Sequence, residues 1–215
     1  KRANALDPNL AYNHYHRAWY LALFGRMNEA IEEHKLAQEL DPFTPDQTAW
    51  LGELYRWVGM YEEGIRQSEK ASLMEDDLNY ALGMFIRGRI FIDQGKVKEG
   101  LELLKQCAEI NPFWAPGYGI ALFETGFIEE GKAILIEMEQ MPPGDWRDLF
   151  IGTYYAHLGD YDKSFEYWSI ENKAAWFPWL RVTLVPDEIR KDPRFLKLMR
   201  DMNLPDPAPL VYNPV

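Results

Sequence analysis

Five glycines recur at nearly even intervals along this chain, and they restrict its fold more than any other feature. They are Gly25, Gly59, Gly95, Gly126 and Gly159, separated by steps of 34, 36, 31 and 33 residues. Two positions after each glycine stands an apolar or aromatic residue. Five positions after it stands a small one, at Ala30, Gly64, Gly100, Gly131 and Ser164. A period near 34 with this punctuation indicates units of helix, tight turn and helix, each of which needs a stacked neighbour to cover its apolar face.

The segments after these glycines have the spacing of amphipathic helices. In the first unit the apolar stripe at steps of three and four is formed by Met27, Ala30, Ile31, His34, Ala37 and Leu40. In the third unit the same stripe is formed by Val97, Gly100, Leu101, Leu104, Cys107 and Ile110. Such a stripe predicts a helix with one buried face. Asp41-Pro42 and Asn111-Pro112 end the two helices, because proline lacks the N–H that the next helical hydrogen bond requires.

The segments before the glycines carry a small residue at a fixed position, seven residues ahead of each turn. These small residues are Ala18, Gly52, Gly88, Gly119 and Gly152. A glycine inside a helix costs about 1 kcal/mol relative to alanine. We therefore expect two helices to approach each other closely at these positions.

The second unit resembles the tetratricopeptide repeat (TPR) family, in Leu51-Gly52, Tyr55, Gly59-Met60-Tyr61-Glu62-Glu63-Gly64-Ile65 and Ala71. Five units of this kind are recognisable. The resemblance implies an all-α fold, a right-handed superhelical solenoid of helix-turn-helix hairpins with a C-terminal capping helix. The sequence departs from the family where a tryptophan is expected, at His14, Thr48, Met84, Ala115 and Asp148, and its fourth unit is short.

We divide the chain into four parts. Residues 1–10 resemble the last turn of a preceding repeat, so we expect a fragment of a longer protein. Residues 11–175 form the five TPR-like repeats, and residues 176–204 form a C-terminal cap whose helix begins at Asp192-Pro193. The cap resembles the closing segment of repeat regions in bacterial signalling proteins, where the repeats follow a winged-helix regulator, a nucleotide cyclase or a kinase. Residues 205–215 form a Pro-rich tail, expected to be extended and able to lie in the protein's own groove.

Composition excludes several classes of partner. The chain has 34 Asp and Glu against 23 Lys and Arg, a net charge of −11, which disfavours direct binding to nucleic acid or anionic lipid. No run of about 18 apolar residues is present, so we expect no membrane insertion. We expect a cytoplasmic location; an extracytoplasmic one stays open if an upstream segment spans a membrane.

Cys107 is the only cysteine, so no disulfide can form within the chain.

The sequence contains no catalytic constellation and no motif for a cofactor. His14 and His16 stand two apart on a helix and point to different faces, and His14 could approach His34 only as a packed pair. Acidic pairs occur at Glu32-Glu33, Glu62-Glu63, Asp76-Asp77 and Glu129-Glu130. We interpret them as solvated charges on outward faces or in loops. We therefore expect a non-enzymatic chain without a cofactor or a metal.

The resemblance to TPR proteins also implies that the first helices line a concave groove. The inward positions then fall at Tyr12, Tyr15, Trp19, Glu53, Arg56, Trp57, Phe85, Arg89, Asp93 and Phe123, and further at Glu124, Trp146 and His157. Aromatic residues and arginine are typical of binding hot spots, and we expect Arg56 and Arg89 to hold an acidic or C-terminal group of the partner.

Three hypotheses follow for the function. The first is an interaction scaffold that binds a peptide or helix of a protein partner. The second is a self-association module that forms a homo-oligomer. The third, an enzyme, lacks any arrangement of nucleophile and base. An alternative for the aromatic residues is plain packing between helices or under the cap.

Overall fold

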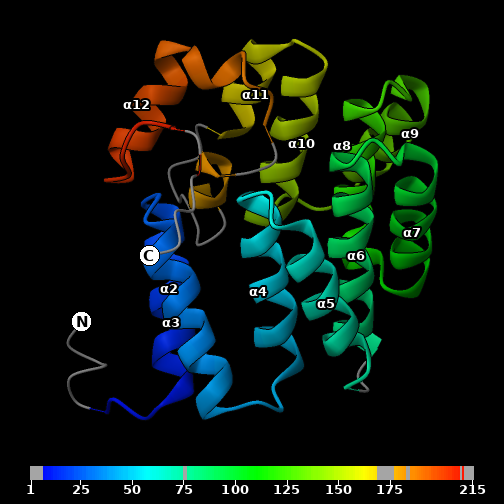
Figure 1. Ribbon diagram of the computed structural model, residues 1–215. Helices are drawn as coiled ribbons and strands as arrows, with labels where there is room; N and C mark the ends of the chain where they lie inside the picture. Colours follow the sequence, from blue (N-terminus) through cyan, green and yellow to red (C-terminus); the bar gives the residue numbers. More distant parts are fainter. Residues whose placement is uncertain (1–6, 75–76, 169–176, 183–184, 209, 211–215) are drawn as a thin grey trace. The chain divides into compact units, whose positions relative to one another are not determined.

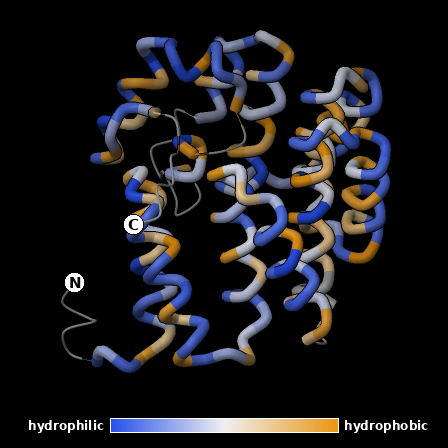
Figure 2. The backbone as a smooth tube through the Cα atoms, in the orientation of Figure 1, coloured by the Kyte–Doolittle hydropathy of each residue, from blue (hydrophilic) through white to orange (hydrophobic). Residues whose placement is uncertain are grey.

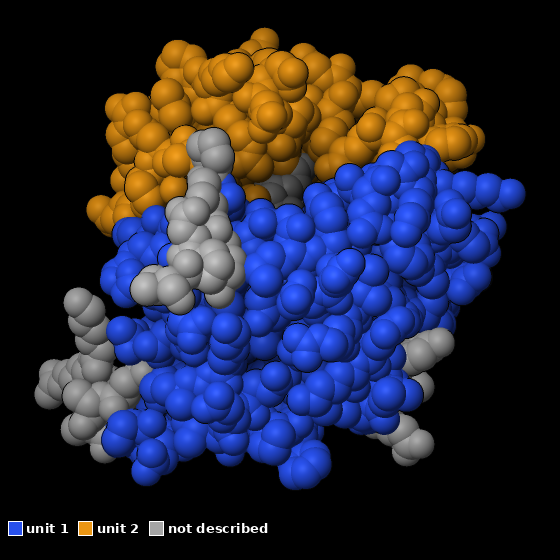
Figure 3. All heavy atoms as spheres, viewed as in Figure 1, with its two compact units in different colours: residues 1–114, 209–215 blue, residues 115–208 orange. Residues whose placement is uncertain are grey.

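The computed structural model describes residues 7–74, 77–168, 177–182, 185–208 and 210. Within these residues the chain forms helices and turns and no strand (Figure 1). The chain divides into two compact units, with residues 1–114 and 209–215 in unit 1 and residues 115–208 in unit 2 (Figure 3). The predicted all-α class is confirmed.

Unit 1 is a stack of three helical hairpins. Its helices are α2 (Ala11–Leu23), α3 (Met27–Leu40), α4 (Pro45–Trp57), α5 (Tyr61–Ser72), α6 (Asp77–Asp93) and α7 (Val97–Ile110), followed by the short 3-10 helix η1 (Pro112–Trp114). Helix α2 packs against α3, α4 against α5, and α6 against α7. Contacts of α3 with α4, and of α6 with both α4 and α5, join one hairpin to the next. Each hairpin therefore covers its neighbour, as the repeat pattern predicts.

Unit 2 holds two further hairpins and the C-terminal segment. Its elements are α8 (Ala115–Glu124), α9 (Ile128–Glu139), α10 (Asp145–His157), α11 (Tyr161–Trp168), the 3-10 helices η2 (Phe177–Arg181) and η3 (Ile189–Lys191), and α12 (Pro193–Asp201). Helix α8 packs against α9, α10 against α11, and α10 also contacts α8 and α9. The right-handed superhelix predicted to run through all five hairpins stays a prediction.

The five periodic glycines form the turns between the paired helices. All five have φ between 75° and 88°, in the left-handed region that only glycine adopts without strain. In the first turn the N–H of Arg26 donates to the carbonyl oxygen of Leu21 over 2.9 Å, and the same bond recurs in the other four. This six-to-one hydrogen bond is the Schellman motif, which satisfies a carbonyl at the end of the first helix.

The small residues bring paired helices into close contact, as predicted. A Cβ built on Gly88 would lie 3.0 Å from the carbonyl oxygen of Gly100, and one built on Gly100 would lie 2.7 Å from that of Gly88. Gly52 and Gly64 face each other in the same way, at 3.0 and 3.1 Å. In unit 2 the glycines instead make room for rings, because Gly119 lies against Tyr154 and Gly152 against Trp168.

The predicted apolar stripes are buried except at their ends. In α3, Met27, Ala30, Ile31, His34 and Ala37 are buried, and in α7 the stripe is buried from Gly100 to Cys107. Hydrophobic and hydrophilic residues accordingly alternate around the helices (Figure 2). Leu40 and Ile110 were predicted to continue the stripes but are exposed, and each is the last residue of its helix.

Cys107 is a fully buried thiol, as its position on the α7 stripe predicts. Its Sγ lies 3.0 Å from the carbonyl oxygen of Ala81 on α6. Burial disfavours the thiolate and raises the pKa of Cys107 to about 12. The residue therefore contributes to the core and has little nucleophilic character.

Helix α12 begins as the sequence predicts and carries a slightly different buried face. Asp192 Oδ1 accepts a 2.8 Å hydrogen bond from the backbone N–H of Arg194, the expected N-cap. Phe195, Leu198 and Met199 are buried. The helical spacing predicts Phe195, Leu196, Met199 and Met202 for this face, but Leu196 and Met202 are half-buried and Leu198 is buried instead.

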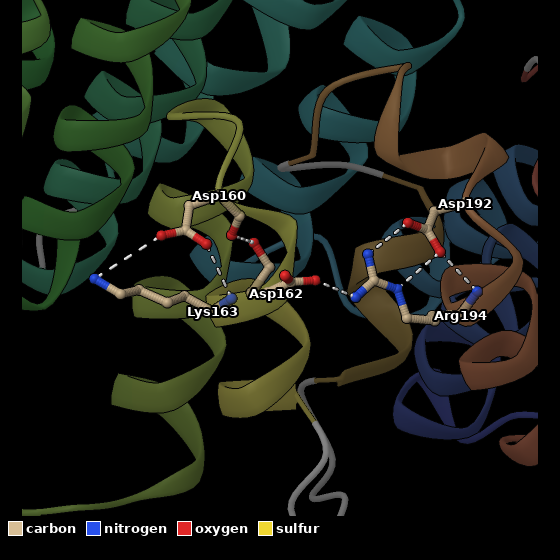
Figure 4. A network of polar contacts seen from close by, with 6 residues as sticks. Asp160, Asp162, Lys163, Asp192 and Arg194 are labelled. Carbon is tan, nitrogen blue, oxygen red and sulfur yellow. Dashed lines mark hydrogen bonds and ion pairs between the residues drawn. The ribbon is translucent and has the colours of Figure 1, made fainter.

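Exposed polar contacts join α12 to α11. The Arg194 guanidinium contacts both Asp192 and Asp162, and beside them Lys163 contacts Asp160 (Figure 4). These pairs are exposed to solvent, so each contributes little to stability. The burial of Phe195 against Trp168, with ring centroids 6.1 Å apart, fixes the helix instead.

Arg181 holds the chain that follows α12. Its Nε donates to the carbonyl oxygen of Pro205 over 3.0 Å, and its Nη2 to that of Asp206 over 3.3 Å. Two predictions fall partly on residues outside the described part of the chain. The end of a preceding repeat was predicted for residues 1–10, of which 1–6 are not described. The occupation of the groove was predicted for the tail at residues 205–215, of which 209 and 211–215 are not described.

Candidate functional site

The predicted groove residues are distributed over both units and differ in exposure. Nine of the ten lie on α2, α4 and α6 of unit 1, and Phe123 lies on α8 of unit 2. Tyr12 is 60% exposed, and Asp93 is also exposed. Phe123 is buried, and so are four of the nine residues on unit 1, namely Trp19, Glu53, Arg56 and Arg89. The others on unit 1 (Tyr15, Trp57 and Phe85) are half-buried and therefore present part of a ring to solvent.

Aromatic rings from α2 and α4 form a continuous cluster in unit 1. Trp19 lies at its centre, with its ring centroid 6.2 Å from that of Tyr15, 5.1 Å from Trp50 and 5.9 Å from Trp57. All three contacts are edge-to-face, the arrangement that the ring quadrupoles favour. We call the cluster of Tyr15, Trp19, Trp50 and Trp57 the aromatic cluster. It joins the first hairpin to the second through side chains.

An ion network centred on the buried side chains of Arg56 and Glu53 borders the aromatic cluster. Arg56 donates through Nε and Nη2 to the two carboxylate oxygens of Glu53, over 2.8 and 2.7 Å, and through Nη1 to Asp93 Oδ2 over 2.8 Å. The indole N–H of Trp57 donates to Glu53 Oε1 over 2.9 Å. Burial alone would lower the pKa of Arg56, but the two carboxylates outweigh it and the pKa is raised. Arg56 is therefore a fixed cation, and through Glu53 it orients the Trp57 ring.

The other end of the cluster is fixed by polar contacts from α3 and α4. The hydroxyl of Tyr15 donates to Asp46 Oδ2 over 2.9 Å, and burial, together with this carboxylate, raises the pKa of Tyr15. Behind Tyr15 and Trp19 lies His34, whose Nε2 donates to the carbonyl oxygen of Gln47 over 2.7 Å. Burial lowers the pKa of His34 to about 4, so the ring is neutral at pH 7.

Of the remaining predicted residues, Tyr12 and Phe85 each reach this cluster through an intermediate ring, because His16 lies 5.1 Å from Tyr15 and Trp114 lies 6.4 Å from Trp50. Phe85 packs on Trp114 with ring centroids 4.9 Å apart, and Tyr12 packs on His16 at 4.1 Å. Phe123 belongs to the core of unit 2, where it packs on Tyr154. The structure thus joins six of the predicted residues directly through side-chain contacts, namely Tyr15, Trp19, Glu53, Arg56, Trp57 and Asp93.

Sequence reasoning missed Trp50, Asp46 and Trp114 as parts of this region. Trp50 had a detectable signal, because it stands seven residues before Trp57 and so shares its helix face.

Glu33 was predicted to be a solvated charge, and this was wrong. It pairs with His14 at 2.8 Å and with Arg17 at 2.6 Å, and its side chain is largely buried once the first hairpin closes.

The described residues provide no site for a metal. None of their His, Cys, Asp and Glu side chains gather in groups of three or more that could hold an ion. Among the helices of the described residues, none combines the length and apolar character needed to cross a bilayer.

No protein-family model and no curated protein sequence matches the chain. Among solved structures it is similar to YrrB, described as a TPR protein with an unusual peptide-binding site, at 18% identity and a TM-score of 0.45 over 94% of this chain and 97% of that one. It is also similar to the MamA protein, at 16% identity and a TM-score of 0.44 over 74% of this chain and 88% of that one. At these TM-scores the fold assignment rests on the chain's own helices.

Proposed function

We propose that the chain is a non-catalytic protein-interaction module whose unit 1 binds a peptide segment or helix of a protein partner. The aromatic cluster, with Tyr12 beside it on α2, is the proposed contact surface. The observation that carries the proposal is the set of half-buried rings around Trp19, in which Glu53 of the ion network orients Trp57 and Asp46 orients Tyr15. Large rings held in place before binding lose little conformational entropy on association, and Trp and Tyr are the residues most often found at binding hot spots.

The ion network changes the role proposed for Arg56. Each of its three guanidinium nitrogens already donates to Glu53 or Asp93, and the Arg56 side chain is 8% exposed, so little of the guanidinium is open to an acidic group of a partner. We therefore propose that Arg56 positions Trp57 and that the aromatic rings supply most of the binding energy. Arg89 is buried as well, and its predicted contact with an acidic group stays a prediction.

The setting of this module is proposed from sequence alone. The resemblance of residues 176–205 to the closing segment of bacterial signalling proteins supports a regulatory or sensory part of a larger protein. In that setting, binding on unit 1 would be relayed to an effector elsewhere in the chain.

Two tyrosines on α2 give a matched pair of variants for the test. Tyr12 lies on the proposed surface and is 60% exposed, whereas Tyr20 lies off it and is 63% exposed. A random peptide library displayed on phage is selected on the purified chain, and the enriched peptide is synthesised and titrated calorimetrically. We expect Tyr12→Ser and Trp57→Phe to weaken binding by about tenfold, or about 1.4 kcal/mol, and Tyr20→Ser to leave it unchanged. The absence of any enriched peptide, or equal binding by Tyr12→Ser and Tyr20→Ser, would contradict the proposal.

A further inference from the structure

The aromatic cluster continues across unit 1 as a longer row of rings. On α2 it is extended by His16, whose ring centroid lies 5.1 Å from the cluster, and by Tyr12, 4.1 Å from His16. On the other side Trp114 of η1 lies 6.4 Å from Trp50 of the cluster and packs on Phe85 of α6 at 4.9 Å. We call the cluster together with Tyr12, His16, Trp114 and Phe85 the aromatic row. It joins side chains from all three hairpins of unit 1.

One hydrogen-bond donor in this row has no partner among the described residues. The indole N–H of Trp114 is buried and donates to no described group, whereas that of Trp57 donates to Glu53. A buried donor without an acceptor costs about 1 to 3 kcal/mol, and a buried tryptophan usually has one. The ring of Trp114 is half-buried, so it can turn this N–H toward a bound segment. The row therefore suits a ligand that brings a carbonyl oxygen as well as apolar surface.

The charges beside the row disfavour an acidic ligand. Three carboxylates, those of Asp46, Glu53 and Asp93, are hydrogen-bonded to the cluster or to the neighbouring Arg56. These contacts bring three negative charges and one positive charge to the row. A neutral segment avoids the repulsion that an acidic one would meet there.

The chain contains such a segment in its Pro-rich tail. Residues 207–215 include no Asp, Glu, Lys or Arg, although 27% of the residues in the chain are charged. Pro207, Pro209 and Pro214 fix their own φ and restrict the residue before each to extended conformations. Residues 205–208 accordingly form no helix. A polyproline II segment leaves its carbonyl oxygens without internal partners, and grooves lined by aromatic rings bind such segments.

The structure shows where this segment begins. Arg181 of unit 2 donates to the carbonyl oxygens of Pro205 and Asp206, and so holds the chain just before the neutral segment. Residues 209–215 are grouped with unit 1, which carries the aromatic row. This grouping favours unit 1 as the place where the tail docks.

We propose that residues 207–215 dock on the aromatic row of the same chain as a polyproline II segment and there compete with the partner peptide. This inference rests on the proposed function and adds its regulation, because a partner has to displace the tail before it binds. Rings of the row pack against the prolines, and Trp114 donates to a carbonyl oxygen of the segment.

A chain that ends at Asp206 tests the proposal, because it lacks the docking segment and keeps both acceptors of Arg181. Tryptophan indole N–H signals in NMR spectra, assigned by single substitutions, report on the row. We expect removal of the segment to shift the signals of Trp50 and Trp114 and to leave that of Trp168, fully buried in unit 2, in place. A synthetic peptide of residues 207–215 should reverse the shifts saturably. The same peptide with glycine for its three prolines should bind at least about threefold more weakly, because a flexible segment loses more entropy on binding.

A substitution in the full chain keeps the test decisive if the shortened chain is perturbed. Tyr212→Asp brings a carboxylate toward the negative charges beside the row, and it should shift the Trp50 and Trp114 signals as removal of the segment does. Leu73→Asp adds the same charge at a residue that is 83% exposed at the end of α5, and it should leave them in place. Circular dichroism of all variants shows whether the fold is kept.

Competition gives the tail a measurable effect on partner binding. A segment tethered by a short flexible linker acts at an effective concentration of about 1 mM. With a Kd of about 0.1 mM for the free peptide of residues 207–215, the peptide selected by phage display should bind the shortened chain about tenfold more tightly than the full chain.

The outcomes separate this inference from the proposed function. Binding of the selected peptide to the shortened chain tests the proposed function by itself. Equal affinity of that peptide for the full and shortened chains would overturn the docking of the tail and leave the proposed function standing. Trp50 and Trp114 signals that do not move when the segment is removed would do the same. Signals of the full chain that change with protein concentration would assign the docked tail to a second copy, and so contradict docking within one chain.

Discussion

Replacing Gly100 by alanine sets two physical effects of opposite sign against each other. Alanine is favoured over glycine inside a helix by about 1 kcal/mol, which would stabilise α7. The new Cβ, however, would lie 2.7 Å from the carbonyl oxygen of Gly88 and 3.1 Å from the backbone nitrogen of Ile92, both on α6. The first contact is about 0.7 Å short of the 3.4 Å at which ordinary contact begins, and backbone atoms of a packed helix cannot retreat as a side chain can.

Overpacking of this kind costs about 1 to 3 kcal/mol, and here the upper part of the range applies because the opposing atoms are backbone. After the gain in helix propensity we expect Gly100→Ala to lower the free energy of unfolding by about 1 to 2 kcal/mol. Urea unfolding followed by circular dichroism measures the change. Lys105→Ala, at an exposed position of the same helix, is the control and should change stability by less than about 0.5 kcal/mol. A Gly100→Ala chain that is more stable than the wild type would refute the close packing of α6 on α7.

Three further predictions concern buried polar groups. Glu53→Gln should lower the free energy of unfolding by about 3 kcal/mol. Asp93→Asn should lower it clearly less, because the side chain of Glu53 is 5% exposed and that of Asp93 is 26% exposed. Equal losses in urea unfolding would contradict this ranking. Burial lowers the pKa of His34 from 6.5 to about 4, so protonation of His34 favours the unfolded chain. The free energy of unfolding should therefore be unaffected by His34 above pH 6.5 and should fall by about 3 kcal/mol as the pH drops from 6.5 through 4. His34→Gln should remove that part of the pH profile, and an unchanged profile would exclude His34 as its source. Cys107 should react with a thiol reagent only as fast as the chain unfolds, and rapid labelling of the native protein would argue against its burial.

The hairpins could be predicted from the sequence because their causes are local. The turn glycines have positive φ, and the small residues at fixed distances from them allow close contact of the paired helices. Both signals recur with the period of the repeat, so each unit supports the interpretation of the next. The stripe predictions that failed, at Leu40 and Ile110, concern the last residue of a helix, where the helical spacing alone does not show that burial ends.

The candidate site could be predicted only in part, because its polar contacts depend on how hairpins stack. Glu53 stands three residues before Arg56, and such a pair can be predicted from helical spacing. Asp93 stands 37 residues after Arg56, and only the packing of α6 against α4 brings it within 2.8 Å. Without Asp93 the sequence left Arg56 free to bind a ligand, whereas the structure engages it within the protein.

The central claim, that unit 1 binds its partner on the aromatic cluster, is tested most directly by the tryptophan indole N–H signals in an NMR titration. The chain has eight tryptophans, and assignment by single substitutions separates Trp57, whose N–H donates to Glu53, from Trp168, which is fully buried in unit 2 and donates to Leu149. Titration with the selected peptide should shift the signals of Trp57 and Trp50 and leave that of Trp168 in place. Saturated binding that leaves the signals of Trp57 and Trp50 unmoved would contradict the account.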